Sequence, residues 1–364
     1  MIGNISDKLR KFDWALAAAV FLLFCLGLAA IYSVSLSKAV PDFGNFRKQI
    51  VFGAVGFAAL VFFGVSNYSG LRVYSRLVQV TTVILLVLVL FIGSIVHGTK
   101  GWFMIAGFGL QPVEFAKIAL IIVLARFFSN RFQHFQIAKH IIISLFITLS
   151  FVILVALQPD LGSAIVLMGI WLLLLAFTGL PKRYFLFMLF IALVLAAIAW
   201  TGFLADYQQS RILTFLHPTS DPLGGGYNVT QSIIAIGSGH FFGRGLGSGS
   251  QSQLRFIPES QTDFIFAVIA EELGLFGVFL VLAFFAVILY RLFAIARRAR
   301  DDFGLFLCLG IACVFFIHLF VNVGMNMGLM PVAGISLPFL SYGGSFLVSC
   351  LIMVGIAESV AVRR

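Results

Sequence analysis

Four carboxylates lie in or just before one apolar stretch of the chain, residues 257–274: Glu259, Asp263, Glu271 and Glu272. If this stretch is helical, Asp263 and Glu271 lie on one face, about 12 Å apart at a rise of about 1.5 Å per residue. An ionisable side chain in a bilayer costs about 2.5 to 3.5 kcal/mol on insertion scales, so it usually marks a functional site. The sequence therefore predicts a functional acidic face. The alternative is an interfacial acid followed by a helix-packing pair of glutamates.

Three further charged residues lie within or beside apolar runs. Glu114 and Lys117 are spaced i, i+3 and share a helix face, so a structural ion pair is as good an interpretation as a substrate contact. Asp160 follows Gln158 and Pro159 at the start of another apolar run, where an acid favours the helix dipole. Asp160 is therefore either a helix cap or a site residue.

Two glycine-rich segments complete the candidates. Residues 243–253 offer backbone amides and the Arg244 guanidinium, which together suit a phosphate, although a flexible loop is the alternative. An uncharged segment around 338–345, interrupted by Pro and Gly, follows Asn322 and Asn326. Such a backbone at membrane depth needs burial or a polar cavity, so we expect it to border the same cavity as Asp263. The six histidines show no ligand spacing, so no histidine metal site is predicted.

Composition defines the class of protein that must position these groups. Of the 364 residues, 61% are hydrophobic and only 10% are charged, and the mean hydropathy is +1.09. This is far from a soluble domain and predicts a polytopic membrane protein. The net charge of +10 is explained by basic cytoplasmic loops, so no nucleic-acid partner is expected. All four cysteines lie in apolar runs without the spacing of a disulfide framework or a zinc site.

Apolar runs of spanning length predict a single all-α domain, residues 1–364, with about ten transmembrane helices. A long loop, about 205–263, separates the seventh helix from the eighth, and we expect a short helix within 228–239 at the membrane interface. The predicted spans are 14–33, 49–66, 77–96, 112–128, 140–157, 161–179, 184–204, 264–290, 303–325 and 340–361.

The distribution of Lys and Arg predicts the orientation of the chain. With the N-terminus inside, 16 of the 24 basic residues lie in cytoplasmic segments, seven lie outside and Lys117 lies within the membrane. The positive-inside rule then makes both termini cytoplasmic. The loop 205–263 lies outside the cell, with Asp263 near the outer mouth of its helix.

The motifs resemble the SEDS family (shape, elongation, division and sporulation), which includes RodA, FtsW and SpoVE. Asp13-Trp14, Gly101-Trp102 and the compact length look more like RodA. Gln261 and Val113 depart from the usual His and Ser of the family. The segments that carry the resemblance are 111–117, 158–164, 235–239, 243–247, 258–268, 271–274 and 337–345.

The resemblance implies a peptidoglycan glycosyltransferase for cell elongation, which polymerises lipid II at the outer face of the bacterial cytoplasmic membrane with a class B penicillin-binding protein as partner. Asp263 is then the catalytic base, or it positions a divalent cation such as Mg²⁺ or Mn²⁺. Gly53 and Gly56 share a helix face and are expected to pack on the partner's membrane span. The expected substrate-binding residues are Arg47, Lys48, Trp102, Asp160, Arg211, Arg244, Glu259, Thr262 and Ser341.

Other functions remain open at this point. A lipid II flippase would also have intramembrane charges and interrupted helices, although the charges are few and no inverted repeat is evident. A division polymerase like FtsW would share the chemistry. A non-catalytic scaffold for wall enzymes would tolerate the loss of Asp263.

Overall fold

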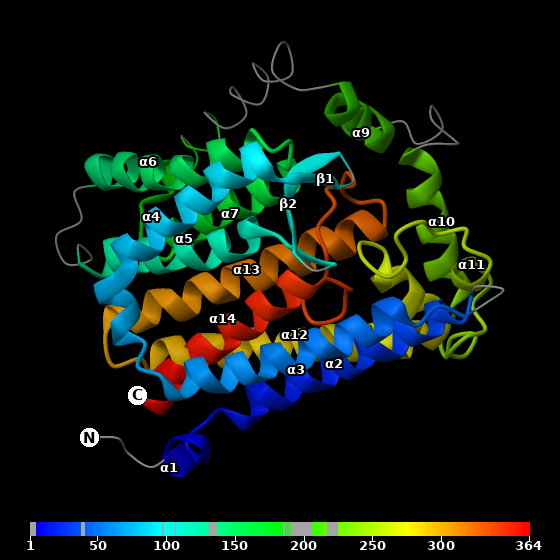
Figure 1. Ribbon diagram of the computed structural model, residues 1–364, viewed down its shortest axis with the longest axis horizontal. Helices are drawn as coiled ribbons and strands as arrows, with labels where there is room; N and C mark the ends of the chain where they lie inside the picture. The colour runs from blue at the N-terminus through cyan, green and yellow to red at the C-terminus, as the bar shows by residue number, and fades with distance from the viewer. Residues whose placement is uncertain are drawn as a thin grey trace.

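The computed structural model describes residues 5–37, 41–96, 98–105, 107–130, 137–184, 186, 188, 190, 206–216 and 225–364. It is a bundle of long helices that run roughly side by side (Figure 1). Nine helices coincide with nine of the ten predicted spans. They are α2 (Trp14–Ser35), α3 (Gly44–Val65), α4 (Ser69–Ile92), α5 (Pro112–Ser129), α6 (Ile137–Ala156), α7 (Leu161–Ala176), α12 (Ile265–Arg297), α13 (Asp302–Asn326) and α14 (Gly344–Val362).

The tenth predicted span, 184–204, lies almost entirely outside the described residues. Within the described part of the chain, seven helices are long and apolar enough to cross a membrane. They do not include α5, which carries three charged residues, or α7, which has 16 residues. The membrane class is confirmed, whereas the number of ten spans stays a prediction.

Short elements lie between the long helices. They are α1 (Ile5–Arg10), α9 (Asp206–Leu216), α10 (Gly225–Ser238) and α11 (Ser250–Gln253), with three strands, β1 (Ser94–Val96), β2 (Thr99–Ile105) and β3 (Phe108–Leu110). Helix α10 confirms the helix expected within 228–239.

The strands form an antiparallel sheet in the order β1-β2-β3, which an all-α prediction did not include. Gly98 and Gly107, both at φ 81°, lie at the two connections, where glycine adopts a positive φ without steric cost. The predicted span 77–96 was therefore wrong at its end, because α4 stops at Ile92 and β1 follows.

The N-terminal end of α2 and the C-terminal ends of α12 and α14 meet at one end of the bundle, where α1 and the C-terminus also lie (Figure 1). The Arg291 guanidinium donates to both carboxylate oxygens of Asp13, at 2.8 and 3.0 Å from Nε. The backbone N–H of Asp13 donates to the Glu358 carboxylate at 2.7 Å. This network joins α2, α12 and α14 and agrees with termini that share one side of the membrane.

Gly53 and Gly56 pack inside the chain. A Cβ at Gly53 would collide with the Phe24 ring of α2, and one at Gly56 would collide with Leu351 of α14. These glycines let α3 approach two helices of its own bundle closely. The expectation that they pack on a partner's membrane span is therefore wrong.

Candidate active-site cavity

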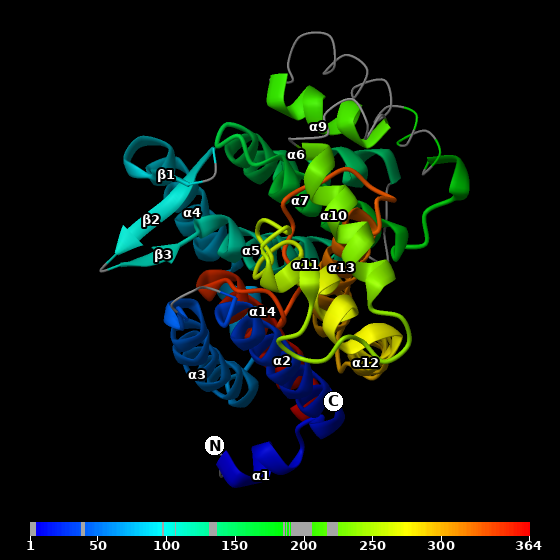
Figure 2. The same cartoon turned by 90° about the vertical axis from the view of Figure 1, so that its right-hand side faces the viewer.

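A cavity of about 570 Å³, lined by charged, polar and apolar side chains, lies where α14 begins, at the end of that helix away from the C-terminus. This volume suits a small-molecule site. Its walls come from the N-terminal halves of α3, α5, α7 and α14, from the three strands, from α13 and from the segments that precede α12 and α14. Figure 2 shows that α9 and α10 lie over the same end. The predicted site residues that line it are Lys48, Trp102, Glu114, Lys117, Asp160, Arg211, Glu259, Thr262 and Asp263.

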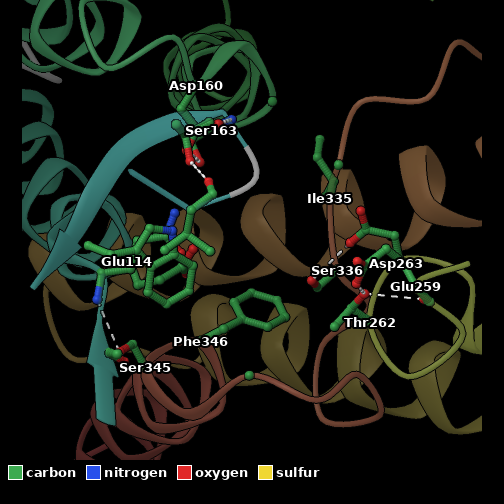
Figure 3. Close-up of a pocket in the computed structure, with 18 of the residues that line it drawn as sticks. Glu114, Asp160, Ser163, Glu259, Thr262, Asp263, Ile335, Ser336, Ser345 and Phe346 are labelled. Carbon is green, nitrogen blue, oxygen red and sulfur yellow. Dashed lines mark hydrogen bonds between the residues drawn. The ribbon is translucent and has the colours of Figure 1, made fainter. Parts of the chain in front are cut away.

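Asp263 forms one side of this cavity with Glu259 and Thr262 (Figure 3). The Ser336 hydroxyl donates to Asp263 Oδ1 at 3.4 Å, and the Thr262 hydroxyl donates to Glu259 Oε2 at 2.9 Å. Gly334 approaches with φ 66°, and a Cβ there would lie 3.8 Å from Asp263 Oδ2. Two carboxylates and two hydroxyls thus lie close together near the N-terminus of α12.

Asparagines of α13 hold this side from behind. Asn322 Nδ2 donates to the backbone carbonyl of Asp263 at 2.9 Å, and Asn326 Nδ2 donates to the same carbonyl at 3.0 Å. Both asparagines are fully buried. The backbone of Asp263 is therefore fixed while its side chain borders the cavity.

Asp160 lies across the cavity from Asp263 (Figure 3). Its carboxylate accepts from the Ser163 N–H at 2.9 Å and from the Ser163 hydroxyl at 2.7 Å, so it caps α7. The cap interpretation is confirmed. Asp160 also lines the cavity, so its contact with substrate stays a prediction.

Glu114 and Lys117 form the ion pair that their spacing predicts. Lys117 Nζ donates to the two Glu114 oxygens at 2.9 and 3.0 Å, and both residues are buried. Lys117 Nζ also lies 3.2 Å from Nε2 of His318, on α13. The pair and His318 together form part of the cavity wall.

The match to known proteins covers almost the whole chain. The family model of FtsW, RodA and SpoVE, described as "Cell cycle protein", matches residues 13–364. This chain belongs to the SEDS family. It is 39% identical over 349 residues to peptidoglycan glycosyltransferase MrdB of Escherichia coli K12, covering 94% of this chain and 93% of the relative. It is 37% identical over 369 residues to stage V sporulation protein E of Bacillus subtilis, covering 98% and 99%.

A solved structure has the same fold. It is described as "Structural coordination of polymerization and crosslinking by a peptidoglycan synthase complex". One of its chains superposes with a TM-score of 0.82 at 31% identity, covering 96% of this chain and 97% of that one. The SEDS fold therefore extends over the whole bundle and cavity.

Three of the substrate-binding residues predicted for this SEDS protein lie off the cavity. Arg47 and Arg244 are exposed, and Arg244 Nε donates to the Ser238 carbonyl at 3.2 Å. Ser341 is buried, and its hydroxyl donates to the Thr262 carbonyl at 2.7 Å. Ser341 thus holds the backbone beside Asp263. Adjacent residues of α3 separate in this way, since Lys48 faces the cavity and Arg47 does not.

The predicted acidic face is wrong. Helix α12 begins only at Ile265, so Asp263 lies before the helix, and α12 is broken at Gly274, where φ is 65°. Glu271 and Glu272 are buried away from the cavity. The Glu271 carboxylate accepts from the N–H groups of Gln251 and Ser252 at 2.7 and 2.9 Å.

The glycine-rich segment 243–253 does not form a phosphate cradle. The N–H of Arg244 donates to the Glu271 carbonyl at 3.0 Å, and the N–H of Gly245 donates to the Glu272 carbonyl at 2.9 Å. The N–H of Gly247 donates to the Ser33 hydroxyl at 2.9 Å. The first two amides close the break in α12 and the third binds α2, so none of the three is available to a substrate phosphate.

Two cavity residues were missed by sequence reasoning. Ser336 and His318 line the cavity, as does Tyr342 of the expected segment 338–345. Burial raises the pKa of the Tyr342 phenol, so it stays neutral and can donate a hydrogen bond. A signal for His318 was present, because it lies four residues before Asn322 and eight before Asn326, on one helix face.

Proposed function

We propose that this protein is a peptidoglycan glycosyltransferase that joins lipid II molecules into glycan strands at the outer face of the cytoplasmic membrane. The observation that carries the proposal is the position of Asp263 in a cavity that contains, besides Lys117, two further cationic side chains, Lys48 and Arg211. The names of the relatives support the reaction class. The membrane bundle around the cavity suits a substrate with a lipid tail.

The reaction requires a base and an anion-binding group. Asp263 accepts the proton of the acceptor sugar hydroxyl as its oxygen attacks the anomeric carbon of the donor. The bond between that carbon and the pyrophosphate oxygen breaks, and the electron pair leaves with undecaprenyl pyrophosphate. Lys48 and Arg211 stabilise the charge that develops on the departing pyrophosphate. Arg47 and Arg244, being off the cavity, are not part of this proposal.

A divalent cation fits the acidic side of the cavity. Asp263 and Glu259 are two carboxylates in one wall, and Mg²⁺ is usually held by one or two carboxylates together with substrate phosphates and water. In the described part of the chain, no group of three or more His, Cys, Asp and Glu residues could hold a metal alone. Bound there, Mg²⁺ or Mn²⁺ would supply positive charge that stabilises the negative charge on the pyrophosphate and on the acceptor oxygen. Chelation should then lower polymerisation, and the added metal should restore it.

The partner in this proposal is a class B penicillin-binding protein, and the role is in elongation. The similarity to a chain of a peptidoglycan synthase complex supports a partner. Co-purification with crosslinking tests the partner, and full activity of a monomer without it would make the partner dispensable. The shape of cells that are depleted of this protein tests the proposed role in elongation. Rounded cells would support a role in elongation, whereas filamentous cells would indicate a role in division.

The central experiment uses the purified protein with its partner, lipid II and a gel that resolves glycan length. Asp263→Asn keeps the size of the side chain but removes the base, so we expect a loss of about 10²- to 10⁴-fold in polymer formation. Asp302→Asn, at the opposite end of the bundle, is the matched control and should remain active. Near wild-type polymerisation by Asp263→Asn would exclude Asp263 as the base. Absence of polymer from the wild type would favour a flippase or scaffold.

A further inference from the structure

His318 lies between the buried ion pair and the segment beside Asp263. Its Nε2 is 3.2 Å from Lys117 Nζ, and its Nδ1 is 2.9 Å from the Ser336 carbonyl oxygen. A lysine ammonium has only hydrogens to offer, so Nε2 must accept. A neutral imidazole that accepts at Nε2 carries its hydrogen on Nδ1, and Nδ1 donates to Ser336. The two contacts together select one tautomer.

The orientation of the ring is also held. The His318 ring stacks on the Phe346 ring with centroids 4.9 Å apart and an interplanar angle of 26°. Lys117 Nζ lies 5.3 Å from the centroid of the same Phe346 ring. His318 is only 2% exposed. Because the ring is stacked and buried, it has little freedom to turn away from Ser336.

The segment that His318 holds touches Asp263. The Ser336 hydroxyl donates to Asp263 Oδ1 at 3.4 Å. One turn further along α13, Asn322 Nδ2 donates to the Ile335 carbonyl at 2.7 Å and to the Asp263 carbonyl at 2.9 Å. One face of α13 thus binds two successive carbonyls, those of Ile335 and Ser336. The Ser336 side chain of the same segment contacts the Asp263 carboxylate.

We propose that His318 is a positioning residue for Asp263, and that Lys117 and the Ser336 carbonyl together select the tautomer that lets it act. The ion pair of Glu114 and Lys117 then does more than neutralise charge, because Lys117 directs the imidazole hydrogen toward Ser336. Ser336 in turn presents its hydroxyl to the Asp263 carboxylate. The effect on catalysis rests on the proposed polymerase function, whereas the tautomer can be measured without it.

The tautomer is tested by NMR on the full-length protein in lipid bilayers with ¹⁵N-labelled histidine. The chain has six histidines, and the His318 signal is assigned by its absence from His318→Gln. The wild type should show a neutral ring with hydrogen on Nδ1. In Lys117→Met the Nε2 nitrogen loses its donor while Nδ1 keeps the Ser336 carbonyl, so the Nε2 resonance is expected to move toward that of an acceptor nitrogen without a hydrogen bond. Hydrogen on Nε2 in the wild type, or an unchanged signal in Lys117→Met, would overturn the proposal whether or not the protein polymerises lipid II.

The catalytic effect is tested with two replacements of His318. A glutamine can accept from Lys117 through its carbonyl and donate to Ser336 through its amide, whereas a leucine can do neither. His318→Leu should lower the turnover number by about tenfold or more with little change in KM, the range expected when a buried hydrogen bond is lost. The turnover number of His318→Gln should lie within about threefold of the wild-type turnover number, because glutamine can make both hydrogen bonds.

The control is His140→Gln, because His140 is a buried histidine of α6 that does not line the cavity. It should keep wild-type turnover. Equal losses in His318→Gln and His318→Leu would indicate a packing role and reject the proposal, as would full turnover in His318→Leu. If His318→Leu does not fold, the turnover of His318→Gln and the histidine NMR signal of Lys117→Met still test the proposal. If the wild type makes no polymer, the proposed function fails, and the NMR result stands by itself.

Discussion

The side-chain amide of Asn322 donates to the backbone carbonyl of Asp263 at 2.9 Å, although 59 residues separate the two in the chain. The same amide donates to the Ile335 carbonyl at 2.7 Å. One buried side chain of α13 therefore joins the two segments that form the acidic side of the cavity. Asn322 binds only the backbone of Asp263, so the Asp263 carboxylate can border the cavity and make its other contacts.

Replacing Asn322 should lower activity without changing any group proposed to touch substrate. In Asn322→Leu the buried Ile335 carbonyl loses the Asn322 donor, and a buried group left unsatisfied costs about 1 to 3 kcal/mol, whereas the Asp263 carbonyl keeps the Asn326 donor. We expect a lower melting temperature in detergent and a slower turnover of lipid II. Asn326→Leu is the comparison, since Asn326 shares the Asp263 carbonyl but does not reach Ile335. Equal or larger losses in Asn326→Leu would contradict the role assigned to Asn322.

Cations that line the cavity should matter more than cations that do not. Lys48→Met and Arg211→Met should each lower polymerisation by about tenfold or more, because a hydrogen bond to a charged group contributes about 1.5 to 3 kcal/mol. Arg47→Met and Arg244→Met are matched controls from the same part of the chain. Rates are measured with the partner present. Comparable losses in both sets would show that the cavity does not decide which cation meets the pyrophosphate.

Glu114 and Lys117 should behave as a coupled pair. Removal of one partner leaves a buried charge without its counterpart, which costs about 3 to 5 kcal/mol. Glu114→Gln and Lys117→Met should each reduce the yield of folded protein or its activity. The double variant should lose less than the sum of the two, measured by thermal unfolding and turnover. Additive losses would show that the two side chains do not interact in the folded protein.

The orientation of the bundle can be measured directly. A reporter fused after residue 240 should report the outside of the cell, whereas reporters after residue 298 and at the C-terminus should report the cytoplasm. The physical reason is the excess of Lys and Arg in the segments predicted to be cytoplasmic, because basic loops tend to stay inside the cell. A cytoplasmic signal at residue 240 would place the cavity on the wrong side for an extracellular polymer. The reaction proposed for Asp263 would then fail as well.

Local pattern determined most of the framework. Runs of apolar residues predicted nine of the described helices, since a helix in a bilayer satisfies its own backbone hydrogen bonds. The spacing of Glu114 and Lys117 predicted their ion pair because i, i+3 neighbours meet on any α-helix. The segment around 338–345 was expected to border the cavity of Asp263, and its residues 342–345 line it.

Tertiary structure decided which polar groups share the cavity. Lys117 meets His318 across 201 residues, and no local spacing encodes such a contact, because it depends on how α5 packs on α13. Glu271 is not on a common face with Asp263 because α12 begins only after Asp263, and the Glu271 carboxylate instead binds the N–H groups of Gln251 and Ser252. Helical periodicity relates only residues on one unbroken helix. The packing of distant segments therefore determined where Glu271, Arg244 and Ser341 lie.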